Sequence, residues 1–162
     1  MIGAMKDFDV TRMQGIWSKM SSVPMGKKLF SRAAGLVAPY TATIGAQVVD
    51  FEPGYARVSM ADRRAVRNHL RCVHAVALVN LAELTGNLAL IAAMPSDARM
   101  IVKGLSIEYL KKARGNLTAT GRCAVPNTSA KQDIDVQVEI ADAKGEVVAK
   151  AVVKSYLAPK RN

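Results

Sequence analysis

Residues 74–94, His-Ala-Val-Ala-Leu-Val-Asn-Leu-Ala-Glu-Leu-Thr-Gly-Asn-Leu-Ala-Leu-Ile-Ala-Ala-Met, decide the fold of this chain. The stretch is apolar almost all round and is followed by Pro95, which predicts one buried helix. It is long enough to cross a membrane, but four residues interrupt it, and a central carboxylate is costly in lipid; they are Asn80, Glu83, Thr85 and Asn87. We therefore expect no membrane span, and a helix that the rest of the chain must cover.

Alternating apolar and polar residues predict strands on both sides of this helix. The alternation is clearest in residues 133–140, where every second residue is Ile or Val. The predicted strands are residues 43–51 and 55–60 before the helix, and 101–110, 117–125, 133–140 and 147–157 after it. Turn signals between the last four strands predict an antiparallel meander. The sequence thus predicts an α+β fold in which an antiparallel sheet of about six strands wraps around a long central helix.

A second helical pattern occupies residues 11–38 and is broken at Ser21-Ser22-Val23-Pro24. This pattern predicts N-terminal helices, which could cover part of the apolar helix. We divide the chain into an N-terminal helical extension, residues 1–39, and a single compact domain, residues 40–162.

The chain of 162 residues carries a formal charge of +10, from 23 Lys and Arg against 13 Asp and Glu. Such a balance favours an anionic partner: nucleic acid, an acidic lipid surface or a phosphorylated small molecule. Nucleic acid ranks last, because no aromatic residues interleave with the basic ones. Two cysteines supply neither a disulfide framework nor a four-ligand zinc site, and the N-terminus shows no signal-peptide pattern, so we expect a cytoplasmic protein.

Glu83 is the strongest catalytic candidate, because it is the one acidic residue within residues 74–94. A buried carboxylate is costly unless it is paired or protonated, so its placement here calls for a reason. One interpretation is structural: Glu83 pairs with a nearby arginine, or its side of the helix is exposed. The other is chemical: Glu83 is a general base or a nucleophile.

The segment just before the helix supplies possible hydrogen-bond donors. Asn68 has a side-chain amide, and the backbone N–H groups at the helix start, around His74 and Ala75, suit a thioester or oxyanion oxygen. His74 and Glu83 are nine residues apart and therefore lie on opposite faces of a helix. If both act in one site, a second subunit related by a two-fold axis must supply one of them.

Two other kinds of site are less favoured. His69 and His74 do not form a His-Glu-x-x-His pattern, so we expect no metal site. Cys72 next to His74 in sequence is not the spatial pairing that a Cys–His nucleophile needs. His74 itself is more easily explained as a helix-start residue than as a catalytic acid.

Basic residues gather in two segments that could hold the phosphates of a ligand. One lies before the helix and includes Arg67 and Arg71; the other includes Lys111, Lys112 and Arg114. Each of these residues alone could equally be solvated surface. No Walker A or G-x-G-x-x-G loop is present, so a nucleotide-hydrolysing or dinucleotide site is not expected.

Two motifs resemble those of a known family. Asn68-x5-His74-Ala75-x2-Leu78-x4-Glu83, followed by Tyr109-Leu110-Lys111-Lys112-Ala113-Arg114-Gly115, is similar to the hotdog-fold thioesterases of the phenylacetic-acid-degradation type. It is closer still to their relatives of uncharacterised function, in which His-Ala-x-Ala-Leu-x-Asn-Leu-Ala-Glu opens the central helix. The resemblance covers about residues 40–158.

The resemblance implies a six-stranded sheet around the helix, a homodimer with continuous sheets that is often paired into tetramers, and hydrolysis of acyl-coenzyme A (acyl-CoA). It implies that Glu83 is base or nucleophile, that Asn68 positions substrate or water, and that the Ala75 N–H polarises the thioester carbonyl across the subunit interface. No cofactor is implied, because coenzyme A (CoA) is part of the substrate. The family usually has Gly at position 75, often Asp at 83, and in some members a hydroxyl residue at 102, where this chain has Ala, Glu and Val.

The sequence therefore predicts an acyl-CoA thioesterase. A dehydratase of hydroxyacyl thioesters is an alternative, since His69 and Glu83 have a suitable spacing, but the Pro-Gly-rich stretch of those enzymes is missing. A non-catalytic protein that binds acyl ligands on the same fold is a further alternative.

Overall fold

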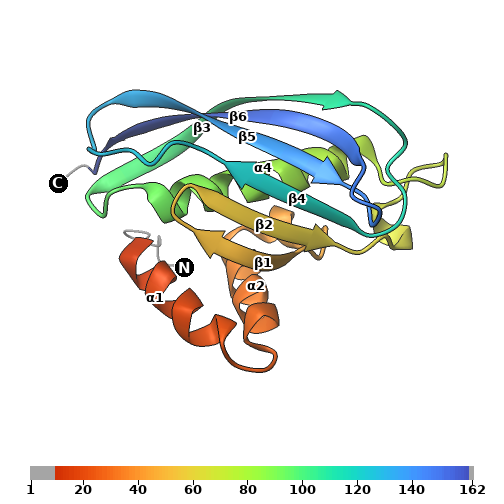
Figure 1. Ribbon diagram of the computed structural model, residues 1–162, viewed down its shortest axis with the longest axis horizontal. Coiled ribbons are helices and arrows are strands. Elements are labelled where there is room, and N and C mark those ends of the chain that lie inside the picture. Colours follow the sequence, from red (N-terminus) through yellow and green to blue (C-terminus); the bar gives the residue numbers. More distant parts are fainter. Residues whose placement is uncertain (1–9, 161–162) are drawn as a thin grey trace, which may run out of the picture.

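The structure is a computed structural model that describes residues 10–160. One antiparallel sheet wraps around one long helix, α4, and the N-terminal helices lie beneath β1 in the view of Figure 1. The predicted α+β architecture is confirmed. The helices are α1 (Val10–Ser21), α2 (Gly26–Val37), α3 (Pro39–Ala42) and α4 (Ala75–Ala93), with a short 3-10 turn, η1 (Arg64–Val66). The strands are β1 (Gln47–Glu52), β2 (Tyr55–Met60), β3 (Ala98–Tyr109), β4 (Leu117–Arg122), β5 (Gln132–Ala141) and β6 (Val147–Pro159).

The six strands lie in the order β1-β2-β4-β5-β6-β3. The predicted meander of the last four strands is therefore wrong at its first step. β3 pairs with β6 at the edge of the sheet, whereas β4 pairs with β2, with Val58 opposite Ala119. The reason is that α4 carries the chain across the sheet, so that β3 forms the far edge and β4 returns to the middle. Turn residues mark where strands end, but they do not say which strands pair.

Two glycines let α4 approach the sheet closely. A Cβ at Gly86 would lie 2.8 Å from Val153 Cγ2, and a Cβ at Gly121 would lie 3.0 Å from the Thr85 carbonyl oxygen. On this side of α4, Leu81 and Ala82 are fully buried. α4 is long and apolar enough to cross a membrane, but 61% of its most apolar window is buried within the protein. Its composition is that of a core helix.

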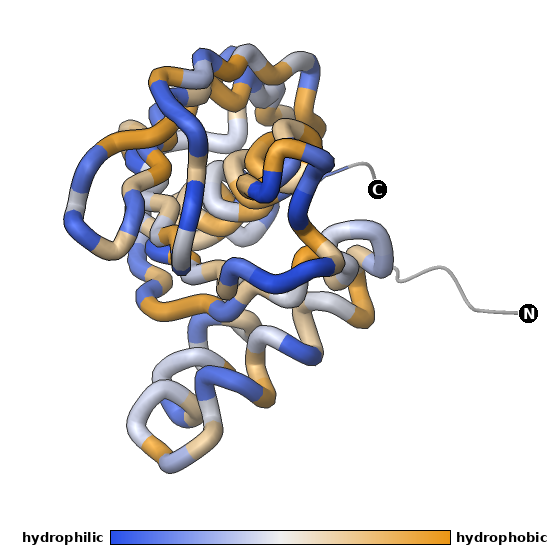
Figure 2. Tube along the Cα trace, turned by 90° about the vertical axis from the view of Figure 1, so that its right-hand side faces the viewer, coloured by the Kyte–Doolittle hydropathy of each residue, from blue (hydrophilic) through white to orange (hydrophobic). Residues whose placement is uncertain are grey.

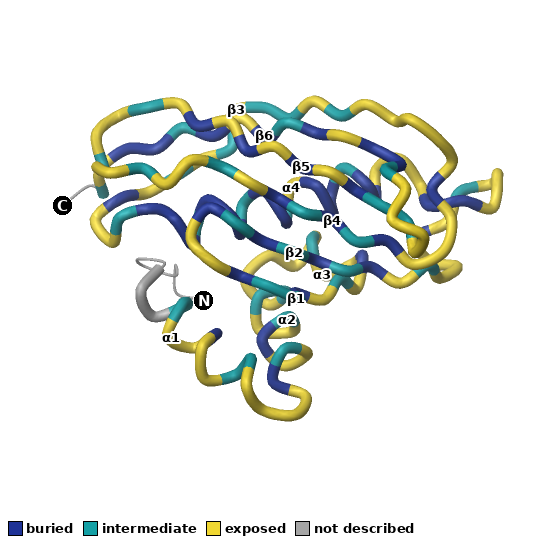
Figure 3. Tube along the Cα trace, viewed as in Figure 1, coloured by how far each residue is buried: buried dark blue, intermediate teal, exposed yellow. Residues whose placement is uncertain are grey.

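The other side of α4 is not covered by the chain. Val76 and Glu83 are exposed, and Val79, Asn87 and Ile91 are only half-buried. In contrast, the strands alternate between buried and exposed residues in the ordinary way, as β5 does in Figure 3. The sequence predicts a helix that is covered all round, and the chain alone covers one side of it.

The N-terminal helices are attached to β1 by an aromatic cluster. The ring centroid of Trp17 lies 5.0 Å from that of Phe30 and 6.1 Å from that of Phe51. The predicted break between α1 and α2 is present, and a further short helix, α3, which the sequence did not predict, begins at Pro39. In Figure 2 these helices form the bottom of the molecule, with hydrophilic and hydrophobic residues side by side. Residues 1–9 of the predicted extension lie outside the described residues.

Candidate functional site

The loop before α4 is held together by the side chain of Asn68. Its Oδ1 accepts hydrogen bonds from the Leu70 N–H (2.9 Å) and the Cys72 N–H (3.3 Å). The loop is also joined to its surroundings by the backbone, since the Val73 N–H donates to the Ala113 carbonyl at 2.9 Å. The amide oxygen of Asn68 is thus occupied, while its NH₂ group makes no hydrogen bond with the described residues. The sequence predicted a donor at this position, and the geometry is compatible with that role.

The first turn of α4 has one unpaired N–H group among the described residues. His74 is the N-cap, and its Nδ1 accepts a hydrogen bond from the Val76 N–H at 3.1 Å. The N–H groups of Ala77 and Leu78 both donate to the His74 carbonyl. Only the Ala75 N–H remains without an acceptor, and Ala75 is exposed. A free N–H at the positive end of a long helix is suited to a developing negative charge.

Glu83 lies halfway along α4 and lines a concave, largely apolar region between α4 and β3. Among its neighbours in this region are Asn87, Ile91 and Met100, and Val37 reaches it from the end of α2. Arg99 and Lys160 bring positive charge to the same region. Within residues 13–160 the Glu83 carboxylate has no hydrogen bond or ion pair, and it is exposed. Of the two predicted structural explanations, the pairing arginine is absent among the described residues, and the exposed side of the helix is present in the single subunit.

The two parts of the candidate site are far apart within one chain. Ala75 and Glu83 are separated by eight residues of continuous helix, or about 12 Å along its axis. A thioester carbonyl that accepts a hydrogen bond from the Ala75 N–H therefore lies beyond the reach of the Glu83 carboxylate of the same chain. The single subunit carries both halves of a site but does not bring them together.

Two of the five predicted phosphate ligands are engaged in ion pairs within the chain. Arg67 Nε donates to Asp62 Oδ1 at 2.6 Å, and Asp62 Oδ2 accepts from the Gly115 N–H at 2.9 Å. The hydrogen bond from Arg67 lowers the pKa of the Asp62 carboxyl, and the Gly115 N–H acts in the same direction. Lys111 pairs with Glu146 and Asp142, and the bond to Glu146 raises the pKa of Lys111.

The other three predicted phosphate ligands are exposed. Arg71, Lys112 and Arg114 make no ion pair with the residues that the structure describes. The Val73–Ala113 hydrogen bond places their two segments side by side, near the start of α4. The sequence contains the two basic segments, but it could not show that Arg67 pairs with Asp62, or that Lys111 pairs with Asp142 and Glu146 much later in the chain.

Sequence reasoning gave no role in the site to two residues that lie near its two halves. Asn87 lies one turn after Glu83, and its Oδ1 is buried without a hydrogen-bond partner among the described residues. The i, i+4 spacing from Glu83 is the signal that could have found it. Tyr109 donates from its hydroxyl to the Ala75 carbonyl at 3.3 Å, which ties the end of β3 to the first turn of α4. Partial burial raises the pKa of Tyr109, so its hydroxyl is a donor at neutral pH.

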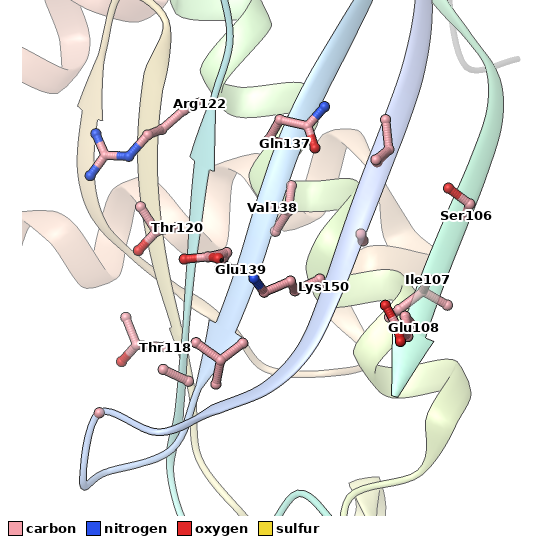
Figure 4. Close-up of a pocket in the computed structure, with 15 residues that line it drawn as sticks. Ser106, Ile107, Glu108, Thr118, Thr120, Arg122, Gln137, Val138, Glu139 and Lys150 are labelled. Carbon is pink, nitrogen blue, oxygen red and sulfur yellow. Dashed lines mark ion pairs between the residues drawn. The ribbon is translucent and has the colours of Figure 1, made fainter. Parts of the chain in front are cut away.

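A second concave region lies over the outer face of the sheet and holds none of the predicted site residues (Figure 4). Its side chains are a mixture of polar and apolar ones, the polar ones including Thr120, Gln137 and Glu139, and Lys150 pairs with Glu139 at 3.2 Å. These residues occupy the exposed positions of strands whose alternate residues are buried beneath them. The region therefore resembles the solvent-exposed face of an ordinary antiparallel sheet.

The structure does not bring metal ligands or a nucleophilic cysteine together. No three His, Cys, Asp or Glu residues within residues 13–160 are close enough to hold a metal ion. Cys72 is buried, and its Sγ donates to Asn68 Oδ1 at 3.4 Å rather than to His74. Cys123 is partly buried, and this burial raises the pKa of its thiol to about 11.

Comparison with known proteins places the chain in a family. The family model described as "Domain of unknown function (DUF4442)" matches residues 26–157. A protein whose crystal structure is described as "genomics APC5556" is 32% identical in sequence to this chain. The two structures match with a TM-score of 0.79, over 92% of this chain and 99% of the other. None of the curated proteins matches this sequence.

More distant structures show the fold. A Pseudomonas aeruginosa protein described as a "probable thioesterase" is 23% identical, with a TM-score of 0.73 over 85% of this chain and 97% of its own. The Escherichia coli PaaI protein from the phenylacetic acid degradation operon is 21% identical (TM-score 0.63; 80% and 97% covered). A Streptococcus mutans protein solved with acetyl-CoA is 24% identical (TM-score 0.60; 71% and 90% covered). The architecture is the hotdog fold of thioesterases, as the sequence predicted.

Proposed function

Because this chain belongs to the DUF4442 family and has the hotdog fold of solved thioesterases, we propose that it is an acyl-CoA thioesterase that works as a homodimer. One observation carries the proposal. The Ala75 N–H is unpaired at the start of α4, and Glu83 lies exposed about 12 Å further along it. Each is half of a hydrolytic site, and neither is useful without the other.

A second copy of the chain would complete the site. When two α4 helices lie antiparallel and cross at a two-fold axis near Val79, the first turn of one helix, with Ala75, comes next to Glu83 of the other. The side of α4 that carries Glu83 is uncovered, and the apolar residues Val76, Val79 and Ile91 lie on the same side. β3 is an edge strand, so it is free to extend the sheet into the partner. Both features support an isologous dimer.

The reaction follows from the residue types. Glu83 of one subunit takes a proton from water, and the resulting hydroxide attacks the thioester carbonyl carbon. The oxyanion accepts a hydrogen bond from the Ala75 N–H of the other subunit, at the positive end of α4. The carbon–sulfur bond then breaks, and the thiolate of CoA takes the proton from Glu83. Direct attack by the Glu83 carboxylate, with hydrolysis of the acyl-enzyme afterwards, uses the same two groups.

The surroundings supply sites for both parts of the substrate. The apolar residues beside Glu83, including Val37, Ile91 and Met100, suit an acyl chain. Arg71, Lys112 and Arg114 lie near the start of α4 without ion pairs, and they suit the phosphates of CoA. The acetyl-CoA that binds the Streptococcus mutans protein of the same fold supports a CoA thioester as substrate. The reaction needs no further cofactor.

The decisive experiment is thiol release from a panel of acyl-CoA substrates by the wild type and Glu83→Gln. We expect turnover by the wild type and a fall of about 10²–10⁴ in kcat for Glu83→Gln, because the general base is lost. Glu108→Gln is the matched control, since Glu108 is exposed on β3 over the outer face of the sheet. Binding of acyl-CoA without any turnover would instead make the protein a non-catalytic acyl-ligand binder. Conversion of hydroxyacyl-CoA to enoyl-CoA would make it a dehydratase.

Mixing two inactive variants tests whether the site lies between subunits. Glu83→Gln and Asn68→Ala each damage one half of the site. In a mixed dimer, one of the two sites then carries an intact Glu83 and an intact Asn68, so activity should return after the two variants are exchanged. If both residues act within one subunit, every site in the mixed dimer keeps one defect and activity does not return.

A further inference from the structure

The N-terminal helices hold an unusual share of the positive charge. Residues 10–49 contain five basic residues and no acidic residue, which is half of the net charge of +10 of the chain. None of these five basic residues belongs to the site proposed above. The CoA phosphates therefore account for only part of the charge, and the charge of residues 10–49 needs an explanation of its own.

One face of α2 combines positive charge with exposed apolar side chains. Lys28, Arg32 and Leu36 follow one another at four-residue spacing, with Met25 and Leu29 beside them. We call these five residues the α2 surface. Leu36 is 84% exposed, Met25 64% and Leu29 53%. Val23, in the turn before α2, is exposed as well, and in Figure 3 the α1–α2 turn and the outer side of α2 are largely yellow.

The opposite face of α2 is anchored to the sheet, so the α2 surface faces outward on a fixed base. Phe30 is buried in the aromatic cluster with Trp17. The Val48 N–H donates to Ser31 Oγ at 2.9 Å, and Lys27 Nζ donates to the Val49 carbonyl at 2.8 Å. α2 therefore cannot turn its apolar residues inward without losing these contacts.

A groove runs beside the α2 surface, between α2, α3 and the start of β1. Its lining is mainly small and apolar, with Gly35, Ala42, Ala46 and Leu84 among the residues. Lys28 and Arg32 line it too, and no acidic residue is among the described residues that line the groove. The groove thus places apolar surface directly beside two positive charges.

We propose that the α2 surface docks the protein on an anionic lipid bilayer. Leucine and methionine side chains beside lysine and arginine match the boundary between acyl chains and anionic headgroups. A second copy of the chain is a poorer occupant, because a two-fold contact through this face would bring Lys28 and Arg32 of both subunits together with no acidic residue of the helices to balance them. The proposal is independent of the thioesterase site.

The test is co-sedimentation of the full chain with lipid vesicles. We expect binding to vesicles of phosphatidylcholine and phosphatidylglycerol in equal parts, little binding to pure phosphatidylcholine, and weaker binding at high salt. The double variant Lys28→Gln/Arg32→Gln should bind about 25-fold more weakly, since each basic residue at such a surface contributes roughly fivefold. Leu29→Ser/Leu36→Ser should also lose binding, which separates insertion from charge attraction alone.

The matched control is Lys131→Gln/Lys154→Gln, which removes the same charge from exposed lysines elsewhere. An equal loss of binding in this control would overturn the proposal in favour of attraction by net charge. The proposal would also be overturned if the wild type does not sediment with anionic vesicles. The same holds if the α2 variants change the self-association of the protein and leave vesicle binding unchanged. Thioester hydrolysis measured without vesicles should be the same in all these variants, so failure of one proposal does not affect the other.

Discussion

The two sides of α4 differ in almost every property although they belong to one continuous apolar sequence. The side that faces the sheet contains Leu81, Ala82, Thr85 and Gly86, all buried, and the sheet approaches it closely. The other side carries Val76, Glu83, Asn87 and Ile91, exposed or half-buried, with a carboxylate among them. The difference teaches that one apolar helix can pack into the core on one side and leave the other side uncovered, and the uncovered side is the one that we propose for assembly and chemistry. The predictions below test this division, starting from the largest expected effect.

Leu81→Ala should destabilise the protein most. Leu81 is fully buried against the sheet, and removal of its side chain leaves a cavity, so we expect a loss of about 2–5 kcal/mol of unfolding free energy. Leu36→Ala is the matched control, because Leu36 is 84% exposed, and it should change stability by no more than about 0.5 kcal/mol. Urea unfolding followed by circular dichroism measures both. Equal effects would mean that the sheet side of α4 is not the core.

Gly121→Ala should show how tightly the sheet packs on α4. The new methyl group would lie 3.0 Å from the Thr85 carbonyl oxygen, so the strand or the helix must move, at a cost of about 1–3 kcal/mol. Gly104→Ala is a matched substitution in β3, where a Cβ meets no atom within 4 Å. Thermal unfolding of the two variants should separate them clearly. A neutral Gly121→Ala would place α4 further from the sheet than described here.

Val76→Asp should separate the proposed dimer without unfolding the chain. It places a charge on the uncovered side of α4, so we expect self-association to weaken by at least about tenfold, in keeping with the depletion of charge at interface cores. The folded subunit should tolerate an acidic residue in the first turn of a helix. Val125→Asp is the control, because Val76 and Val125 are both 50% exposed. Analytical ultracentrifugation decides: an unchanged dimer in Val76→Asp would remove α4 from the subunit interface.

Asp62→Asn should have the smallest effect, and one that depends on pH. Asp62 is held by Arg67 and the Gly115 N–H, which lower its pKa in the folded protein. A lowered carboxyl pKa stabilises the fold at neutral pH, and this contribution is lost as the pH falls below the unfolded value of about 3.9 and through the folded pKa. Wild type and Asp62→Asn should therefore differ in Tm near pH 7 and converge in acid. A constant difference would point to a steric effect of the substitution.

The sequence predicted the elements well because each depends on local pattern. Alternating apolar residues marked β5, and the apolar run of residues 74–94 marked α4 within one residue at each end. The order of the strands could not be predicted in the same way. β3 and β4 follow each other in the chain, but they are separated in the sheet because α4 crosses it between β2 and β3.

The candidate site was predicted only as a set of residue types. Glu83 stood out as the one acidic residue of an apolar helix, whereas Asn68 and Ala75 were chosen as possible hydrogen-bond donors and from the family resemblance. The hydrogen bonds of these residues could not be predicted from the sequence, since their partners depend on backbone geometry. The pairing of Arg67 with Asp62, and of Lys111 with Asp142 and Glu146, likewise depends on how β-strand ends and loops meet.

The sequence by itself determined that this chain forms one apolar helix within an antiparallel sheet, because hydrophobic periodicity is a local property of the chain. It also determined which residues carry the possible chemistry. The tertiary structure decided which side of α4 the sheet covers, which strands pair, and that Lys111 lies beside Asp142 and Glu146. These depend on contacts between residues distant in sequence, and such contacts exist only once the chain has folded.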